Sequence, residues 1–189
     1  MLTRDEIRRA ETYSISAGIE SSAGAAPPAC TTDGRSITLP LNGTESVWDV
    51  LDAHSITLPL GCASGHCGSC TVLLGDVPVP ACIVPHAEAR GRDIATIATA
   101  SEDALVTAMM EHGAVQCGFC SPGIVVTLSW LIRGAAAEGR VVTVDEVRDA
   151  LTGHLCRCTG YAAVVSAAVA ASKGFSGNGQ GIDEAGTTA

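Results

Sequence analysis

The order of apolar and polar residues divides the chain into two halves with different secondary structure. Apolar and polar residues alternate over 36–39, which predicts a strand, and apolar residues at helical spacing over 46–52 predict a helix. Two further apolar runs, 71–74 and 77–79, flank a Gly-Asp pair typical of a two-residue β-hairpin. We expect strands with one helix across them over residues 35–98.

Beyond residue 99 the signals are helical. Several of them are helix-starting residues, because serine and threonine cap helix N-termini and proline fits the first turn. They are Ser101, Ser121 followed by Pro122, and the capping box of Thr143 and Glu146. The predicted helices lie over 102–111, over 121–137, after Thr143, and over 161–172. We expect these four helices to form a small bundle over residues 99–172.

Both ends of the chain lack a sustained period. Residues 1–34 contain Ser, Ala, Gly and Pro, and residues 173–189 are rich in Gly, Ser, Asn and Thr. We therefore expect a disordered extension and a disordered tail, with a short helix over 3–12. Cys30 has no neighbour at ligand spacing, so we expect it to be a spare exposed thiol.

Three cysteines in the first half follow the spacing C-x4-C-x2-C, which is the plant-type ligand spacing for a 2Fe-2S cluster. The predicted hairpin returns a fourth cysteine toward them. This first quartet consists of Cys62, Cys67, Cys70 and Cys82. Gly65 and Gly68 let the loop turn its N-H groups toward a cluster at little steric cost. His66 is expected to face solvent or to support a ligand, because the four cysteines already complete the site.

A second quartet follows from a C-x2-C pair and a C-x-C pair, each just ahead of a predicted helix. Its members are Cys117, Cys120, Cys156 and Cys158. Helix N-termini favour anions, and an oxidised 2Fe-2S core with four thiolates carries a charge of roughly −2, so two helix starts would stabilise one cluster. The alternative is a four-cysteine zinc site, although zinc modules usually repeat cysteine pairs at shorter separation.

Charge and composition limit the partners. The net charge is −9, with 11 Lys and Arg against 20 Asp and Glu, which disfavours nucleic-acid binding. Charged residues make up only 16% of the chain and hydrophobic residues 47%. This balance indicates either a surface covered by a partner or simply an alanine-rich composition.

The nine cysteines are better explained as metal ligands than as disulfides. The first 20 residues are charged and lack the apolar core of a signal peptide, so we expect a cytoplasmic protein. The longest apolar run, residues 123–132, is too short to cross a bilayer, and we expect no membrane span.

Three stretches resemble the small iron-sulfur subunit of the molybdenum hydroxylases, the family of xanthine oxidase, aldehyde oxidoreductase and carbon monoxide dehydrogenase. They are residues 61–70, 111–123 and 155–161. The resemblance spans about residues 35–172 in the family's order. It implies an α+β fold, in which an N-terminal β-grasp plant-type ferredoxin domain precedes a C-terminal four-helix bundle that binds a second 2Fe-2S cluster.

The resemblance also implies a function. Such a subunit transfers electrons in a complex with a large molybdopterin-binding subunit and an FAD-binding medium subunit, and is not catalytic alone. Electrons would pass from molybdenum to the second quartet, then to the first, then to FAD. Gln116 and Cys158 match family positions beside the pterin. The substrate is left open among aldehydes, purines, N-heterocycles and carbon monoxide, because the large subunit contacts it.

The chain departs from the common family residues at a few positions and keeps all eight cysteine ligands. Residues 56–61 are closer to a free ferredoxin, His154 replaces a common Asn, and Ser69 a common Ala. The competing hypotheses are a free-standing two-cluster ferredoxin and a structural zinc module. Low surface charge favours the fixed subunit, and a zinc protein would be colourless.

Overall fold

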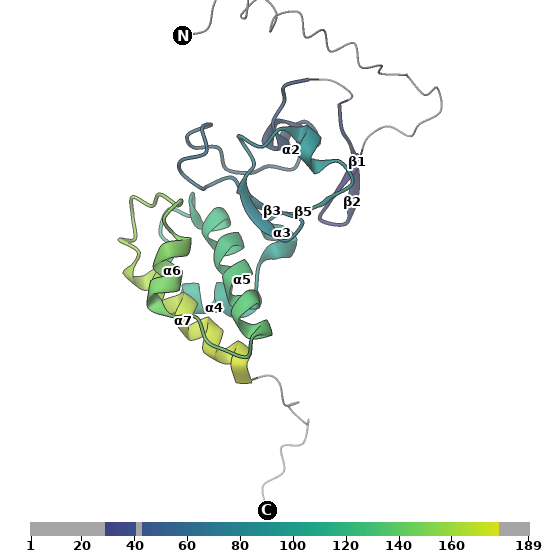
Figure 1. The fold of residues 1–189 in the computed structure, drawn as a ribbon. Helices are drawn as coiled ribbons and strands as arrows, with labels where there is room; N and C mark the ends of the chain where they lie inside the picture. Colours follow the sequence, from purple (N-terminus) through teal and green to yellow (C-terminus); the bar gives the residue numbers. More distant parts are fainter. Residues whose placement is uncertain (1–28, 41–42, 178–189) are drawn as a thin grey trace, which may run out of the picture.

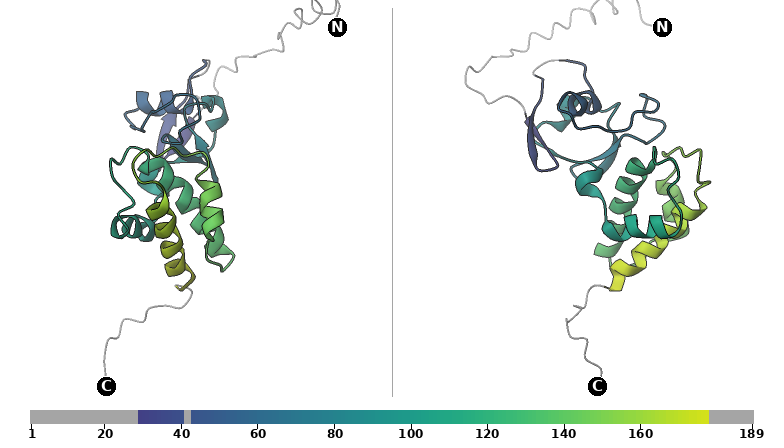
Figure 2. Two further views of the ribbon diagram at one scale, coloured as in Figure 1. Left: turned by 90° about the vertical axis from the view of Figure 1, so that its left-hand side faces the viewer. Right: turned by 180° about the vertical axis from the view of Figure 1, so that it is seen from behind.

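The structure, a computed structural model, describes residues 29–40 and 43–177 (Figure 1). It has a mixed α/β fold with a small sheet and several helices. The sheet and the helices form two adjoining parts, as Figures 1 and 2 show from three directions. The helix expected over 3–12 lies outside the described residues. Among the described residues, no helix is long and apolar enough to cross a membrane.

The first part is built on a five-stranded sheet with the strand order β2-β1-β5-β3-β4. Its strands are β1 (Ala29–Thr32), β2 (Arg35–Thr38), β3 (Thr71–Leu74), β4 (Val77–Pro80) and β5 (Asp93–Ala95). β1 and β5 are parallel, and the other neighbours are antiparallel. The strand predicted at 36–39 and the β3-β4 hairpin are confirmed. Gly75 in the hairpin turn has φ 59°, a value that favours glycine.

Strand β1 corrects the expectation that residues 1–34 are disordered. β1 lies inside the sheet between β2 and β5, and Cys30 pairs with Ile37 of β2. The Cys30 side chain is only 3% exposed, so the prediction of an exposed thiol was wrong. A strand of only four residues is too short to show an alternating pattern in the sequence. It is stabilised instead by pairing with β2 on one edge and β5 on the other.

Helix α2 (Val47–Ala53) crosses the sheet part and begins with a capping box. Ser46 is the cap, and its backbone N-H donates to Asp49 Oδ2 at 2.8 Å. The helix buries Val47, Val50 and Leu51, as its apolar spacing predicted. The N-H groups of Val47 and Trp48 donate to the carbonyls of Val84 and Ala81, which flank Cys82. The short 3-10 helix η1 (His86–Ala89) follows.

The second part contains five helices among the described residues. They are α3 (Ile97–Ala100), α4 (Asp103–Glu111), α5 (Ser121–Ala137), α6 (Val144–Ala150) and α7 (Ala162–Gly177). α7 continues five residues beyond the predicted end at 172, into the segment expected to be disordered. The core of this part is apolar and includes Leu105, Met109, Ile124, Leu128 and Val164.

Two of the predicted caps are corrected. Ser101 ends α3 and does not start α4; Glu102 is the cap residue of α4, and Ser129 Oγ accepts its N-H at 3.0 Å. Ser121 lies in the first turn of α5, whose cap residue is Cys120. The third predicted start, the capping box of Thr143 and Glu146 at α6, is confirmed.

Helix α5 joins the two parts. Its residue Val126 is fully buried in a cluster with Leu73 of β3 and with Ala100. Trp130 Nε1 donates to the carbonyl of Asp76 in the β3-β4 turn at 2.8 Å. One face of α5 therefore packs on the sheet part, while its other faces contribute to the helical core.

Candidate iron-sulfur sites

The loop that carries the first quartet directs its backbone N-H groups at one sulfur atom. The N-H groups of Ser64, His66 and Cys67 point at Cys62 Sγ, with N to S distances of 3.4, 3.2 and 3.4 Å. These hydrogen bonds, that of Ser64 most strongly, lower the pKa of Cys62 to about 5. The site therefore favours the thiolate, which is the form that binds metal.

Two positive φ angles give the loop this shape. Gly65 has φ 77° and Gly68 has φ 70°. A Cβ atom at Gly65 would lie 2.6 Å from Ile83 Cδ1, and one at Gly68 would lie 2.5 Å from a backbone oxygen of the helical part. The predicted role of these glycines in turning the loop fits this geometry.

The other members of the first quartet lie near one another. Burial raises the pKa of Cys70 to about 11, and the neighbouring thiols of Cys82 and Cys67 contribute to the increase. The N-H of Ala81 donates to the carbonyl of Cys70 at 3.3 Å, which brings the hairpin end and Cys82 to the loop. Thiols that oppose one another's ionisation in this way are suited to a shared cation.

The second quartet is assembled from two loops of the helical part. Hydrogen bonding from Phe119 N-H and an interaction with the Cys158 thiol lower the pKa of Cys117. Burial raises the pKa of Cys120 to about 12, with a further contribution from Cys156. The C-x2-C and C-x-C pairs thus lie side by side, as the two-helix-start hypothesis required.

Cys156 is held by its own loop. Its burial favours the thiol, but hydrogen bonds from the side chain and backbone of Thr159 prevail and lower the pKa of Cys156 to about 7. The Thr159 hydroxyl lies 3.1 Å from Cys156 Sγ. The Tyr161 hydroxyl accepts the N-H of Cys156 at 2.7 Å and donates to the carbonyl of His154 at 2.7 Å.

Both donor sets fit a 2Fe-2S cluster. Each has four cysteine sulfurs, and backbone N-H groups point at Cys62 in the first and at Cys156 in the second. In the part of the chain that the structure describes, no three His, Cys, Asp or Glu side chains are grouped to hold one metal ion. A 2Fe-2S cluster divides its four thiolates between two irons, so its ligands do not need to converge on one point.

The structure shows one feature that sequence reasoning missed, a contact between the two cysteine loops. Phe119, beside Cys120, lies against Gly61 of the first loop, where a Cβ would be 3.3 Å from its ring and 3.0 Å from Cys67 Sγ. His154 is 6% exposed, and its Nε2 lies 2.8 Å from Thr127 Oγ1. Burial lowers the pKa of His154 to about 4. The replacement of a common Asn by His154 was the available signal.

The remaining candidates lie at the surface. Gln116 is exposed beside the second quartet, and Cys158, a member of that quartet, is exposed as well. His66 is also exposed, and its Nδ1 lies 3.1 Å from Ser64 Oγ, which agrees with the first of the two expectations, that it faces solvent or supports a ligand.

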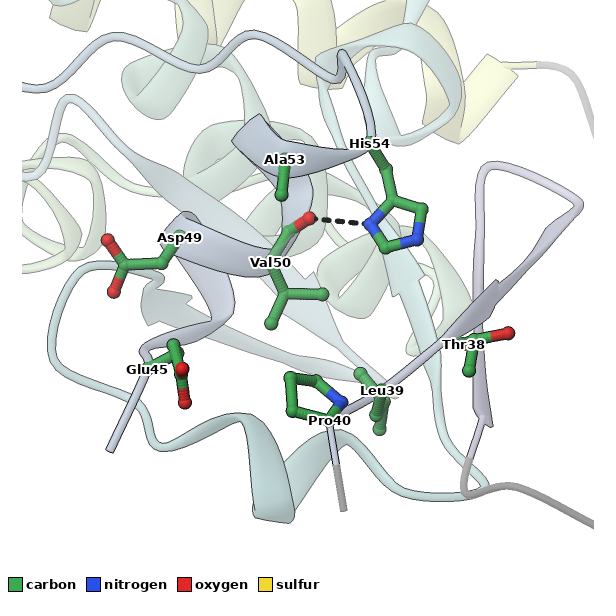
Figure 3. A pocket seen from close by; sticks show the side chains of 8 residues that line it. All are labelled: Thr38, Leu39, Pro40, Glu45, Asp49, Val50, Ala53 and His54. Atoms are coloured by element: carbon green, nitrogen blue, oxygen red, sulfur yellow. Dashed lines mark hydrogen bonds between the residues drawn. The ribbon is translucent and has the colours of Figure 1, made fainter. Parts of the chain in front are cut away.

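A pocket of about 340 Å³ lies on the sheet part, between the end of β2 and α2 (Figure 3). Its lining combines apolar side chains such as Val50 with the carboxylates of Glu45 and Asp49. His54 Nδ1 lies 2.9 Å from the carbonyl of Val50, as the dashed line in Figure 3 shows. No cysteine lines this pocket, so it is separate from both quartets.

Comparison with known proteins assigns both halves. The 2Fe-2S iron-sulfur cluster binding domain matches residues 30–96, and the 2Fe-2S binding domain matches residues 94–169. The nicotine 6-hydroxylase small subunit of Paenarthrobacter nicotinovorans is 36% identical over 140 residues, which cover 71% of this chain and 82% of that protein. The xanthine dehydrogenase iron-sulfur-binding subunit of Escherichia coli O157:H7 is 35% identical over 115 residues, which cover 59% of this chain and 71% of that protein.

Solved structures agree with these relatives. Quinoline 2-oxidoreductase from Pseudomonas putida 86 superposes with a TM-score of 0.69 at 30% identity, covering 79% of this chain and 95% of that chain. Aldehyde oxidoreductase from Desulfovibrio gigas has the same TM-score at 31% identity, covering 78% of this chain and 17% of that chain.

The class defined by this fold and these two sites is a two-domain 2Fe-2S protein. The chain belongs to the small iron-sulfur subunits of the molybdenum hydroxylases, the xanthine dehydrogenase family. Its role is electron transfer within an oxidoreductase complex. The resemblance seen in the sequence is confirmed, and neither the free ferredoxin nor the zinc module is favoured.

Proposed function

We propose that this subunit carries electrons from a molybdopterin subunit to an FAD subunit through two 2Fe-2S clusters. The observation that carries this proposal is the pairing of two complete cysteine quartets whose loops contact each other through the hydrogen bond from Leu155 N-H to the Cys67 carbonyl. The first cluster would be held by Cys62, Cys67, Cys70 and Cys82. The second would be held by Cys117, Cys120, Cys156 and Cys158. Helices α4 to α7 would then form the four-helix bundle of the second domain.

The clusters supply one-electron chemistry, and the chain's own residues supply the environment. N-H groups of the first loop stabilise the negative charge of Cys62, and Thr159 does the same for Cys156. Hydrogen bonds to cluster sulfurs raise a reduction potential because they stabilise the more negative reduced state. Three N-H groups point at Cys62 and one at Cys156, so the two clusters would differ in reduction potential.

The surface near the second quartet supports its placement beside the molybdopterin subunit. Phe119 is 49% exposed, Leu155 60% and Val115 42%, and all three lie within a few residues of a ligand. Apolar side chains so exposed favour burial against a partner. Gln116 and Cys158, exposed at the same loops, would lie nearest the pterin.

The first quartet has its own exposed apolar neighbours, which support a separate contact with an FAD subunit. Ile83, next to Cys82, is 54% exposed, and Leu60 is 37% exposed. The subunit would not be catalytic alone, and the complex would work in the cytoplasm. Its substrate class is left among aldehydes, purines, N-heterocycles and carbon monoxide, because the large subunit would contact the substrate.

Metal content tests the proposal directly. Protein purified without oxygen should contain about four irons and four acid-labile sulfides per chain, with the visible absorbance of 2Fe-2S clusters. A colourless protein with zinc at each quartet would contradict it.

The partner is tested by expression. Produced alone, the chain should aggregate or lose its second cluster, and co-expression with a molybdopterin subunit should prevent this. A stable monomer with both clusters and no co-purifying partner would favour the free two-cluster ferredoxin instead.

A further inference from the structure

Residues 153–156, here called the bridging segment, connect the two cysteine quartets. The N-H of Leu155 donates to the carbonyl of Cys67 at 3.0 Å. The next residue, Cys156, is a member of the second quartet. One hydrogen bond and a short run of covalent bonds therefore join a ligand of the first quartet to a ligand of the second.

The side chain of His154 holds the bridging segment against two other elements. His154 Nε2 lies 2.8 Å from Thr127 Oγ1 on α5, and the residue is 6% exposed. Its ring also packs against the first loop, because a Cβ at Gly68 would lie only 2.3 Å from Nδ1. The imidazole is thus enclosed by α5, the bridging segment and the residue that follows Cys67.

The surroundings leave little room for the segment to shift. The Tyr161 hydroxyl donates to the carbonyl of His154 at 2.7 Å. Helix α5 touches the first loop so closely that a Cβ at Gly123 would lie 2.0 Å from the carbonyl oxygen of Gly68. Within the described residues, His154 Nδ1 has no hydrogen-bond partner, so the bond to Thr127 is the side chain's anchor.

We propose that His154 is a positioning residue for electron transfer between the two clusters. Its bond to Thr127 holds the bridging segment where the N-H of Leu155, the residue before Cys156, can donate to the carbonyl of Cys67. The rate of electron transfer through protein falls steeply when a gap opens in the path. A shift of the bridging segment that lengthens the contact between Leu155 and Cys67 would therefore slow the transfer. His154 itself exchanges neither electron nor proton. The inference rests on the proposed function, because it requires a cluster at each quartet.

The test uses the complex purified without oxygen with its co-expressed partner subunits. Three variants change the anchor: His154→Leu removes the hydrogen bond, Thr127→Val removes it from the side of α5, and His154→Gln keeps a polar group of similar reach. Thr152→Ala is the matched control, since Thr152 is exposed and its hydroxyl bonds only the Arg148 carbonyl at 3.4 Å. Iron and sulfide content is measured first for each protein.

Two readouts follow on variants that hold both clusters. The first is the magnetic splitting between the two reduced clusters in paramagnetic resonance spectra, which depends on their separation and connection. The second is the rate at which an electron moves from one cluster to the other after rapid reduction. His154→Leu and Thr127→Val should lower the splitting and slow the transfer on the order of tenfold, because a displacement of about 1 Å at a reacting contact has effects of that size or larger. His154→Gln should recover most of both, and Thr152→Ala should match the wild type.

The outcomes separate this inference from the function beneath it. Wild-type splitting and rate in His154→Leu and Thr127→Val would overturn the inference. Loss of the second cluster in both variants would also overturn it, since His154 would then be purely structural; if only His154→Leu loses the cluster, Thr127→Val decides. A wild-type protein that lacks iron would instead contradict the proposed function.

Discussion

The two cysteine sites are built in different ways, although each supplies four thiols. Three ligands of the first site, Cys62, Cys67 and Cys70, lie on one continuous loop, and three N-H groups of that loop point at Cys62. The second site combines residues 117–120 with 156–158, which are separated by α5 and α6. The first site is therefore shaped mainly by its own loop, and the second mainly by how the helices pack.

This difference affects how each site responds to change. Cys117 and Cys158 are exposed, whereas Cys70 is 2% exposed. A site held by distant elements loses its geometry when the packing between those elements loosens. We therefore expect the second cluster to be the more sensitive to changes in the helical core and to the presence of the partner.

Ligand substitution should give the largest effect and separates the roles of the two sites. Cys120→Ser should stop electrons from leaving molybdenum, because the cluster nearest to it is lost. Cys67→Ser should remove the first cluster, yet substrate should still reduce the second. Paramagnetic resonance after anaerobic addition of substrate distinguishes the two, in variants that assemble. Normal substrate reduction of the first cluster in Cys120→Ser, with the second cluster absent, would show that the proposed order of transfer is wrong.

Substitutions in the two cores should give the next largest effect. Leu128 in the helical part and Leu51 in the sheet part are both 0% exposed, so Leu128→Ala and Leu51→Ala are a matched pair. Each should lower the free energy of unfolding by about 2–5 kcal/mol. Leu128→Ala should release the second cluster first, because that site depends on helix packing, and Leu51→Ala should not. Visible circular dichroism during heating follows each cluster, and equal loss from both sites in both variants would remove the distinction.

The seam between the two parts is tested by two glycines of the same helix. Gly123→Ala places a Cβ 2.0 Å from the Gly68 carbonyl oxygen, a backbone atom of the first loop, so α5 or that loop must move. We expect the free energy of unfolding to fall by about 1–3 kcal/mol. Gly134→Ala meets no atom within 4 Å and should instead stabilise α5 by about 0.5–1 kcal/mol. Thermal unfolding compares them, and equal melting temperatures would show that the seam adapts.

The sequence predicted most of the local structure, while the assignment of the cysteines to two ligand quartets stays a prediction. The hairpin and the capping box at Thr143 each depend on residues close in the chain, so their patterns were sufficient. Strand β1 was missed because it depends on pairing with β2 and β5, which local sequence does not encode. Ser101 was assigned the wrong helix end for the same reason: Ser129, distant in sequence, satisfies the start of α4.

The contact between the two sites was also beyond the sequence. The hydrogen bond from Leu155 to Cys67, and the packing of His154 against Gly68, arise from how α5 lies on the sheet part. A single sequence reports periodicity within an element, but it does not report the distance between two loops that other elements position. The presence of His154 where the family commonly has Asn drew attention to this position, but it gave no information about the residues around it.

Helix caps should give the smallest effect and extend the comparison to single hydrogen bonds. Ser46 caps α2, whose first N-H groups bind the carbonyls beside Cys82, and Thr143 caps α6, which leads into the bridging segment. Ser46→Ala and Thr143→Ala should each lower the free energy of unfolding by about 1 kcal/mol, since each leaves a helix N-H without its partner. Because the caps act on different sites, Ser46→Ala should speed loss of the first cluster to a chelator, and Thr143→Ala loss of the second. The rates of bleaching at each cluster's own circular dichroism band measure this, with Thr152→Ala as the reference. If both variants speed loss of the same cluster, the two sites are coupled through the seam more tightly than their separate construction implies.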